Sequence, residues 1–209
     1  MADLEHKNIA DPNIHEPKGV ASAAANQVYV ADGLGSGSWT TRVANVEQGI
    51  YDYNDLATAT TPIALTVAGT QYELTNDGAG ANTNLLYPLS GMPDIWDTST
   101  NRFDFTNGSG LALGDTVDLR LTIAVTTTTA NTAVDVDLEL GVGVTPYQVN
   151  ILNAADKKAA GTYTFSIWTN IYMGNSLTLD NPGRILASAD KTGATVEISG
   201  WYFRPLRNS

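Results

Sequence analysis

Alternation of apolar and polar residues dominates the second half of the chain. Residues 116–125 place Val, Leu or Ile at every odd position, with polar or small residues between them. Residues 133–140 repeat the pattern, and Asp135, Asp137 and Glu139 occupy the alternate positions. A period of two is the signature of a strand that buries one face. We therefore expect two strands that each turn an apolar face toward a core.

Shorter alternating segments extend this prediction over most of the chain beyond residue 62. Residues 63–67 and 71–74 flank an Ala-Gly pair and predict a β-hairpin. Further strands are expected at residues 102–105, 147–152, 162–173 and 195–203, and segments 177–179 and 184–188 flank a turn at 180–183. No helical stretch is predicted beyond residue 60. The sequence therefore predicts an all-β fold, an antiparallel β-sandwich of the jelly-roll type.

The N-terminal part of the chain lacks such periodicity. Pro12 and Pro17 restrict the residues before them to extended geometry, and nothing in residues 1–20 could form a core alone. Residues 27–31 (QVYVA) predict one short strand, which a glycine-rich turn connects to Trp39. We expect residues 1–60 to form an extended arm and linker, and residues 61–209 to form the sandwich.

Composition and charge exclude several classes of partner. The net charge is −11, so the chain lacks the clustered Lys and Arg that nucleic acids and anionic membranes attract. There is no cysteine, which excludes disulfides and thiolate metal sites. The chain has no long apolar run, and residues 1–5 show no basic or apolar signal-peptide region. We expect no nucleic-acid or membrane partner.

Candidate catalytic groups are few. The only histidines, His6 and His15, lie in the arm, whereas a Ser-His-Asp triad needs a histidine fixed by a folded scaffold. The acidic row of residues 135–139 is typical of a solvated sheet face. Its alternatives are a glycosidase carboxylate pair or a Ca²⁺ site, but no Asp-x-Asp-x-Asp-Gly loop is present. We expect a protein that is not an enzyme and holds no cofactor or metal.

One further segment combines acids with an aromatic residue. Asp94 and Asp97 flank Trp96, an arrangement that is found in carbohydrate sites and also in turns that bury a tryptophan. Both interpretations stay open, so these three residues form a possible ligand surface. The glycine-rich residues 32–37 are followed by neither the helix nor the Lys of a phosphate-binding loop.

Two regions of the sequence carry a family resemblance. The first runs from IHEPKGV at residues 14–20 through VYVADG at 28–33 to GSGSW at 35–39. The second runs from IWD at 95–97 and RFDF at 102–105 through LGD at 113–115 into the strand at 116–125. In both, the chain resembles bacteriophage virion accessory proteins, in which an anchoring arm precedes a trimeric β-sandwich knob similar in fold to tumour necrosis factor.

This resemblance implies a structural role on the virion surface after assembly in the host cytoplasm. It suggests a homotrimeric capsid decoration or head-fibre protein, docked on the major capsid protein or another virion protein. A tail or baseplate fibre that binds a host glycan or receptor is the alternative, and the lack of heptads and repeats disfavours it. The arm residues expected to anchor the protein are Ile9, Ile14, His15, Pro17, Val20, Val28, Tyr29 and Trp39.

Overall fold

The structure is a computed structural model in which two units are described separately. Its described residues are 23–25, 27–34, 37–41, 46–54, 62–75, 85–92, 94–97, 99–100, 102–106, 110–153 and 159–208. The N-terminal unit ends at Asn45, and the large unit is Val46–Asn208. The described part of the N-terminal unit contains a hairpin, in which β1 (Gln27–Ala31) pairs antiparallel with β2 (Gly37–Thr41).

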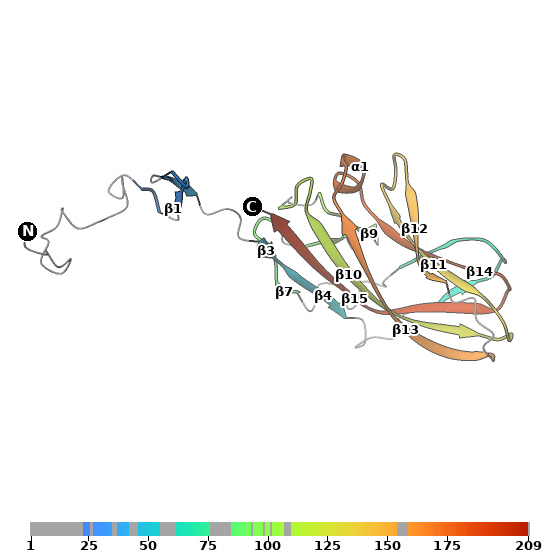
Figure 1. Cartoon of the computed structure of the whole chain (residues 1–209). Helices are drawn as coiled ribbons and strands as arrows, with labels where there is room; N and C mark the ends of the chain where they lie inside the picture. Colours follow the sequence, from blue (N-terminus) through green and yellow to red (C-terminus); the bar gives the residue numbers. More distant parts are fainter. Residues whose placement is uncertain are drawn as a thin grey trace, which may run out of the picture. The chain divides into compact units, whose positions relative to one another are not determined.

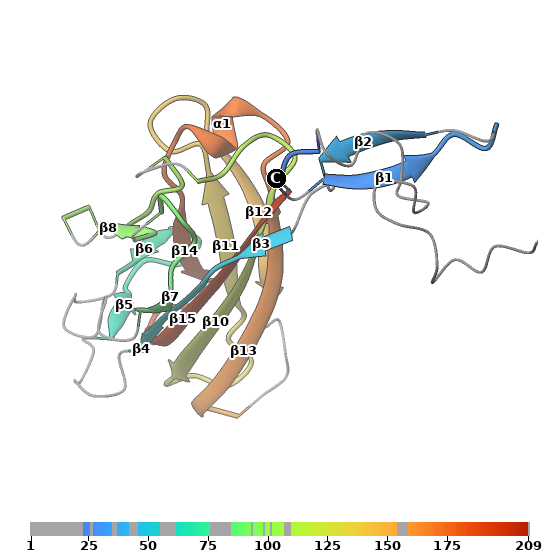
Figure 2. The same ribbon diagram turned by 90° about the vertical axis from the view of Figure 1, so that its left-hand side faces the viewer.

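The large unit is a sandwich of two antiparallel sheets (Figure 1 and Figure 2). The seven-stranded sheet has the order β13 (Gly161–Tyr172), β10 (Thr116–Thr127), β15 (Ala194–Asn208), β4 (Ile50–Asn54) and β7 (Leu85–Tyr87), and β15 also pairs with β3 (Val46–Gln48) and β5 (Ile63–Leu65). The four-stranded sheet has the order β12 (Tyr147–Asn153), β11 (Val134–Leu140), β14 (Arg184–Ala189) and β6 (Tyr72–Leu74). A small two-stranded sheet joins β8 (Trp96–Asp97) to β9 (Arg102–Phe103). The predicted all-β antiparallel sandwich is confirmed.

The core lies between the two sheets. The odd-numbered residues of β10 from Val117 to Val125 are buried, and the even-numbered ones on the other face are partly exposed. On β11 the apolar residues Val134, Val136, Leu138 and Leu140 are buried in the same core. Both faces match the sequence prediction because each strand lies inside its sheet with one side packed against the other layer.

The predicted hairpin of residues 63–67 and 71–74 is wrong. Strand β5 pairs with β15 in the seven-stranded sheet, whereas β6 pairs with β14 in the four-stranded sheet. Leu65 and Leu74 are both buried in the core. The chain therefore crosses from one layer to the other through the turn at Gly69, whose φ of +73° is in the left-handed region that glycine adopts readily.

The sandwich also begins earlier than the predicted boundary at residue 61. Strands β3 and β4 both pair with β15. Tyr51 and Tyr53 on β4 are fully buried. The Tyr51 hydroxyl donates to the carbonyl of Met92 and accepts the Leu89 amide at 2.8 Å. Residues 46–54 are therefore part of the sandwich and not of an arm.

Three C-terminal segments differ in part from the elements that the sequence predicts. The first segment flanking the turn at 180–183 forms a single helical turn, α1 (Ser176–Leu179), whose N-cap Asn175 accepts the Thr178 amide at 3.0 Å. The second segment is β14. Strand β15 runs on to Asn208, beyond the predicted end at Phe203. Within the described residues, no helix is long and apolar enough to cross a membrane.

Candidate binding surfaces

The β1–β2 hairpin holds three of the predicted anchoring residues. Tyr29 and Trp39 lie opposite each other, with ring centroids 5.4 Å apart in an edge-to-face contact. Gly37 is needed here, because a Cβ at this position would lie 2.2 Å from the Val30 carbonyl oxygen. Val28 and Val30 lie on the other face and are 42% and 48% exposed. The hairpin therefore has one aromatic face and one exposed valine face.

The other predicted anchoring residues cannot be placed. Ile9, Ile14, His15, Pro17 and Val20 lie outside the described residues, and so does His6. Their role in docking remains a proposal from the sequence. At the tip of the hairpin, Asp32 accepts the Leu34 amide at 2.8 Å, and Leu34 is 91% exposed.

The structure corrects the possible ligand surface at Trp96. Its side chain is 2% exposed and packs against Trp201, with ring centroids 4.7 Å apart. Asp94 accepts a hydrogen bond from the buried Tyr53 hydroxyl and another from the Trp96 amide at 3.0 Å. Burial, together with Asp94, raises the pKa of Tyr53 well above its usual range. Trp96 therefore offers no ring face to a ligand, and the alternative interpretation, a turn with a buried tryptophan, applies.

Asp97 has a structural role as well. Its carboxylate accepts the Ser99 amide at 2.8 Å, the Ser99 hydroxyl at 2.6 Å and the Thr100 hydroxyl at 2.9 Å. The Ser99 hydroxyl is the largest cause of the lowered pKa of Asp97. The carboxylate stabilises the turn between β8 and β9 and is not oriented toward a common site with Trp96.

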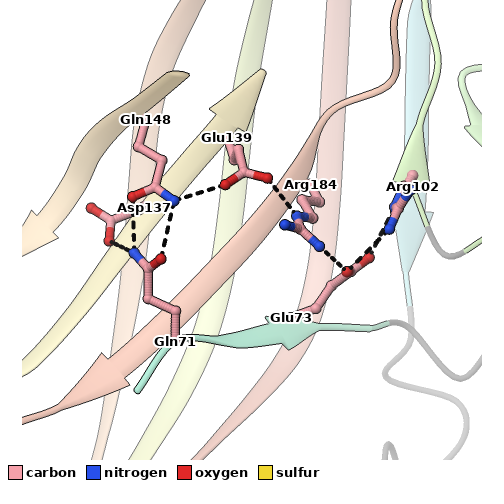
Figure 3. Close-up of polar contacts among 7 residues, drawn as sticks. All are labelled: Gln71, Glu73, Arg102, Asp137, Glu139, Gln148 and Arg184. Atoms are coloured by element: carbon pink, nitrogen blue, oxygen red, sulfur yellow. Dashed lines mark hydrogen bonds and ion pairs between the residues drawn. The ribbon is translucent and has the colours of Figure 1, made fainter. Parts of the chain in front are cut away.

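A polar network covers part of the outer face of the four-stranded sheet (Figure 3). Arg184 on β14 bridges two carboxylates, since its Nε donates to Glu139 and its Nη1 donates to Glu73, each at 2.7 Å. Arg102 on β9 also donates to Glu73, through Nε at 3.2 Å. Gln148 donates to Glu139 at 2.7 Å. The network thus ties β9, β6, β14, β11 and β12 together across the sheet.

The acidic row of β11 is only partly a solvated face. Glu139 is 4% exposed and ion-paired, so it departs from the expected solvated row. Gln71 donates to Asp137 at 2.9 Å. Asp135 has a raised pKa because of burial, with further contributions from the charges of Asp137 and Asp190. The hydrogen bonds of Asp137 and Glu139 stabilise the sheet, and none of the three environments pairs two carboxylates across an open cleft as glycoside hydrolysis would need.

Ion pairing sets the protonation of the network. Burial alone would raise the pKa of Glu73, but the hydrogen bonds from Arg102 and Arg184 outweigh it and the net pKa is lowered. Burial alone would lower the pKa of Arg184, but its hydrogen bonds to Glu73 and Glu139 outweigh it and the net pKa is raised. Among the residues that the structure describes, no group of three or more His, Asp or Glu side chains could hold a metal ion. The ion pairs of the network link β6 to β9 and to β14, and β14 to β11.

The outer face of the seven-stranded sheet carries a second cluster, which the sequence analysis did not single out. We call it the Trp168 row: Trp168 on β13, Arg120 on β10, Tyr202 on β15 and Asp52 on β4 are neighbours in register. The guanidinium carbon of Arg120 lies 5.7 Å from the Trp168 ring centroid and 5.1 Å from that of Tyr202. A carboxylate oxygen of Asp52 lies 3.9 Å from a guanidinium nitrogen of Arg120.

A row of polar side chains lies beside it. Asp118 accepts a hydrogen bond from Asn170 at 2.8 Å and pairs with Arg204 through Nε at 3.0 Å. Burial alone would raise the pKa of Asp118, but the hydrogen bonds from Asn170 and Arg204 lower it overall. The signal for the exposed tryptophan was in the sequence. Tyr163, Phe165 and Ile167 alternate on one side of the predicted strand, which leaves Trp168 on the other.

Comparisons with known proteins find similar folds at low identity. No family model and no curated protein sequence matches the chain. A chain of the T13 particle of infectious bursal disease virus (IBDV) has a TM-score of 0.44 at 9% identity, and covers 84% of this chain and 34% of the viral one. A chain of the VP2 subviral particle of that virus has a TM-score of 0.38 at 8% identity, covering 86% and 37%. The xylan-binding module CBM15 has a TM-score of 0.34 at 10% identity, covering 79% and 99%.

This chain therefore spans about a third of the length of the viral chains it resembles. Because every one of these TM-scores lies below 0.5, we base the proposed function on the residues of the chain itself.

Proposed function

We propose that the protein is a non-enzymatic structural component of a phage virion, which decorates or stabilises the capsid as a head fibre and docks through its N-terminal unit. The observation that carries this proposal is the β1–β2 hairpin. It is a two-stranded element in a unit separate from the sandwich, and such a hairpin is at best marginally stable alone. A hairpin with exposed Val28, Val30 and Leu34 gains stability when a partner covers those side chains.

Docking through such a small element requires several copies. Fixing each backbone residue costs roughly 1 kcal/mol or more of conformational entropy. One hairpin covers little apolar area, so its contacts offset only part of that cost. In a homotrimer three hairpins would act together, and multivalent attachment raises apparent affinity about 10² to 10⁴-fold without any new contact. The proposed partner is the major capsid protein or another virion protein on the particle surface.

The experiment compares a hairpin variant with a matched variant of the sandwich. Val28→Asp/Val30→Asp places two charges on the valine face, whereas Val144→Asp changes a valine of the large unit that is 63% exposed. Each full-length protein is mixed with particles assembled without it, and co-sedimentation is measured. We expect the wild type and Val144→Asp to sediment with particles and the hairpin variant to stay in solution. Full occupancy by the hairpin variant would refute docking through this element.

The alternative that the resemblance implies is a tail or baseplate fibre that binds a host glycan or receptor. Trp96, a ring on which a glycan could have stacked, is buried. A glycan array with the full chain separates the two functions. Specific glycan binding together with no sedimentation on particles would favour the fibre.

A further inference from the structure

Strand β13 is a long edge strand without the usual protection. Its twelve residues, GTYTFSIWTNIY, include no charged residue and no proline. It pairs with β10 along its whole length without a register shift, and no described strand pairs with its other edge. Monomeric proteins protect such edges with lysines, prolines or bulges, because an open edge pairs with another strand. None of these devices is present in β13.

Exposed aromatic side chains lie on the same strand. Trp168 is 62% exposed and Tyr172 is 59% exposed, whereas Trp96 and Trp201 of the same unit are buried. Trp, Tyr and Arg are the residue types that carry most of the binding energy in protein interfaces. The Trp168 row brings all three together, with Arg120 lying over both rings. The composition of this face is that of an interface centre.

The charges of the Trp168 row and of the row beside it balance, unlike those of the whole chain. Arg120 pairs with Asp52, and Arg204 pairs with Asp118, so the two rows carry no net charge. The chain as a whole carries −11, and two copies therefore repel each other at long range. A locally neutral face is the kind of surface on which like-charged copies can meet. A basic partner would instead be attracted to an acidic face.

The charged groups of the two rows are already paired, which favours a protein over a sugar as the occupant of this face. Asp118 already accepts hydrogen bonds from Asn170 and Arg204, and Arg120 is engaged with two rings and Asp52. A sugar needs uncommitted donors and acceptors. What the face offers is ring surface and a strand edge, and both suit another protein chain.

We propose that copies of this chain associate with one another through the Trp168 row and the neighbouring edge of β13. Every copy carries the same edge and the same neutral face, so no second protein is required. The association does not depend on the virion role. It would supply the several hairpins that docking requires.

The test is the mass of the full chain in solution, measured by light scattering and sedimentation equilibrium. Trp168→Glu places a charge at the centre of the row. Tyr87→Glu is the matched control, because Tyr87 is 69% exposed and lies on β7, at the opposite end of the strand order and roughly 19 Å away at the usual strand spacing. We expect the wild type and Tyr87→Glu to be oligomers, and the dissociation constant of Trp168→Glu to rise by about 30-fold or more.

A second variant guards against a folding defect. Ser166→Lys adds a charge to the exposed side of the edge strand without removing a ring, and it too should weaken the oligomer. Far-UV circular dichroism checks that each variant folds. A monomeric wild type at every concentration tested would overturn the proposal, as would an unchanged mass for both variants. A monomeric wild type that binds a glycan, with a change in tryptophan emission lost in Trp168→Glu, would assign the face to a sugar instead.

Discussion

The ion-pair network of the four-stranded sheet makes a quantitative prediction for Arg184→Met. Methionine keeps much of the length and apolar contact of arginine but removes the charge. Arg184 neutralises Glu139, whose side chain is 5% exposed, and shares Glu73, whose side chain is 23% exposed. Without Arg184 the Glu139 carboxylate is buried, and among the described residues its remaining side-chain partner is the Gln148 amide.

The two ion pairs differ in what they contribute. Removing one partner of a buried pair typically costs about 3 to 5 kcal/mol, because the remaining charge is desolvated and uncompensated. Glu73 keeps its ion pair with Arg102 and is more exposed. Losing its ion pair with Arg184 therefore lowers the free energy of unfolding by at most about 1 kcal/mol. Because the amide of Gln148 offsets part of the cost at Glu139, we expect a loss of about 3 kcal/mol in the free energy of unfolding. For a domain of this size that corresponds to a fall in Tm of roughly 6 to 12 °C.

The assay is urea unfolding, with tryptophan fluorescence emission as the signal. Trp96 and Trp201 are buried in the core and report its exposure. Arg102→Met is the matched control, since Arg102 pairs with the more exposed Glu73, at 3.2 Å, and its loss should cost about 1 kcal/mol or less. A double variant, Glu139→Gln with Arg184→Met, removes the stranded charge and should recover part of the loss.

The effect of pH gives the sharper test. A carboxylate that is buried without its partner opposes folding in its charged form, so the deficit of Arg184→Met should shrink as the pH falls from 7 toward 4.5. In the wild type, Glu73 has a pKa below its ordinary 4.5, so its contribution persists through this window and is lost only at lower pH. A deficit no larger than that of Arg102→Met, or one that does not change between pH 7 and 4.5, would refute the reasoning.

Three further predictions concern the sandwich. Gly183→Ala should cost about 1 to 3 kcal/mol in urea unfolding, because its Cβ would lie 2.0 Å from the buried Phe103 ring, and a loss within error would contradict this packing. Asp135→Asn should be more stable than the wild type at pH 7 by up to about 1 kcal/mol, since a raised carboxyl pKa means that ionisation opposes folding, and the gain should vanish below about pH 4. A chain that begins at Val46 should keep the thermal midpoint of the sandwich in calorimetry, whereas one that begins at residue 61 lacks the buried Tyr51 and Tyr53 of β4 and should not fold.

The sequence predicts a strand and its buried face well when the pattern within the segment is enough. It does not predict which strands pair when the partner is remote in the chain. Strands β10 and β11 were predicted with the correct inward faces, because alternation over many residues depends only on one side being buried. Residues 63–67 and 71–74 show the same alternation, yet they belong to different sheets. Local pattern is the same for a hairpin and for a crossing between layers, and the choice is made by strands β14 and β15 more than a hundred residues away.

The tryptophans show the same limit. Trp168 lies in a strand of twelve residues, where the apolar series on the other face fixes its side. Trp96 lies in a strand of two residues after an irregular segment, which is too short for alternation to indicate which side chain is buried. Its burial is decided by contact with Trp201, which is remote in sequence. Acidic residues beside a tryptophan therefore do not indicate a sugar site until the exposure of the ring is known.

The side-chain clusters on the two outer faces of the sandwich differ in net charge, and this difference bears on assembly. The outer face of the four-stranded sheet holds Glu73, Asp135, Asp137 and Glu139 against two arginines, and so keeps an acidic excess. The two rows on the seven-stranded sheet are neutral. If copies meet through the neutral face, the acidic faces point away from one another, which lowers repulsion inside the oligomer and keeps its outer surface soluble. The reverse arrangement would bring the acidic excess of every copy into the interface, where like charges repel most strongly.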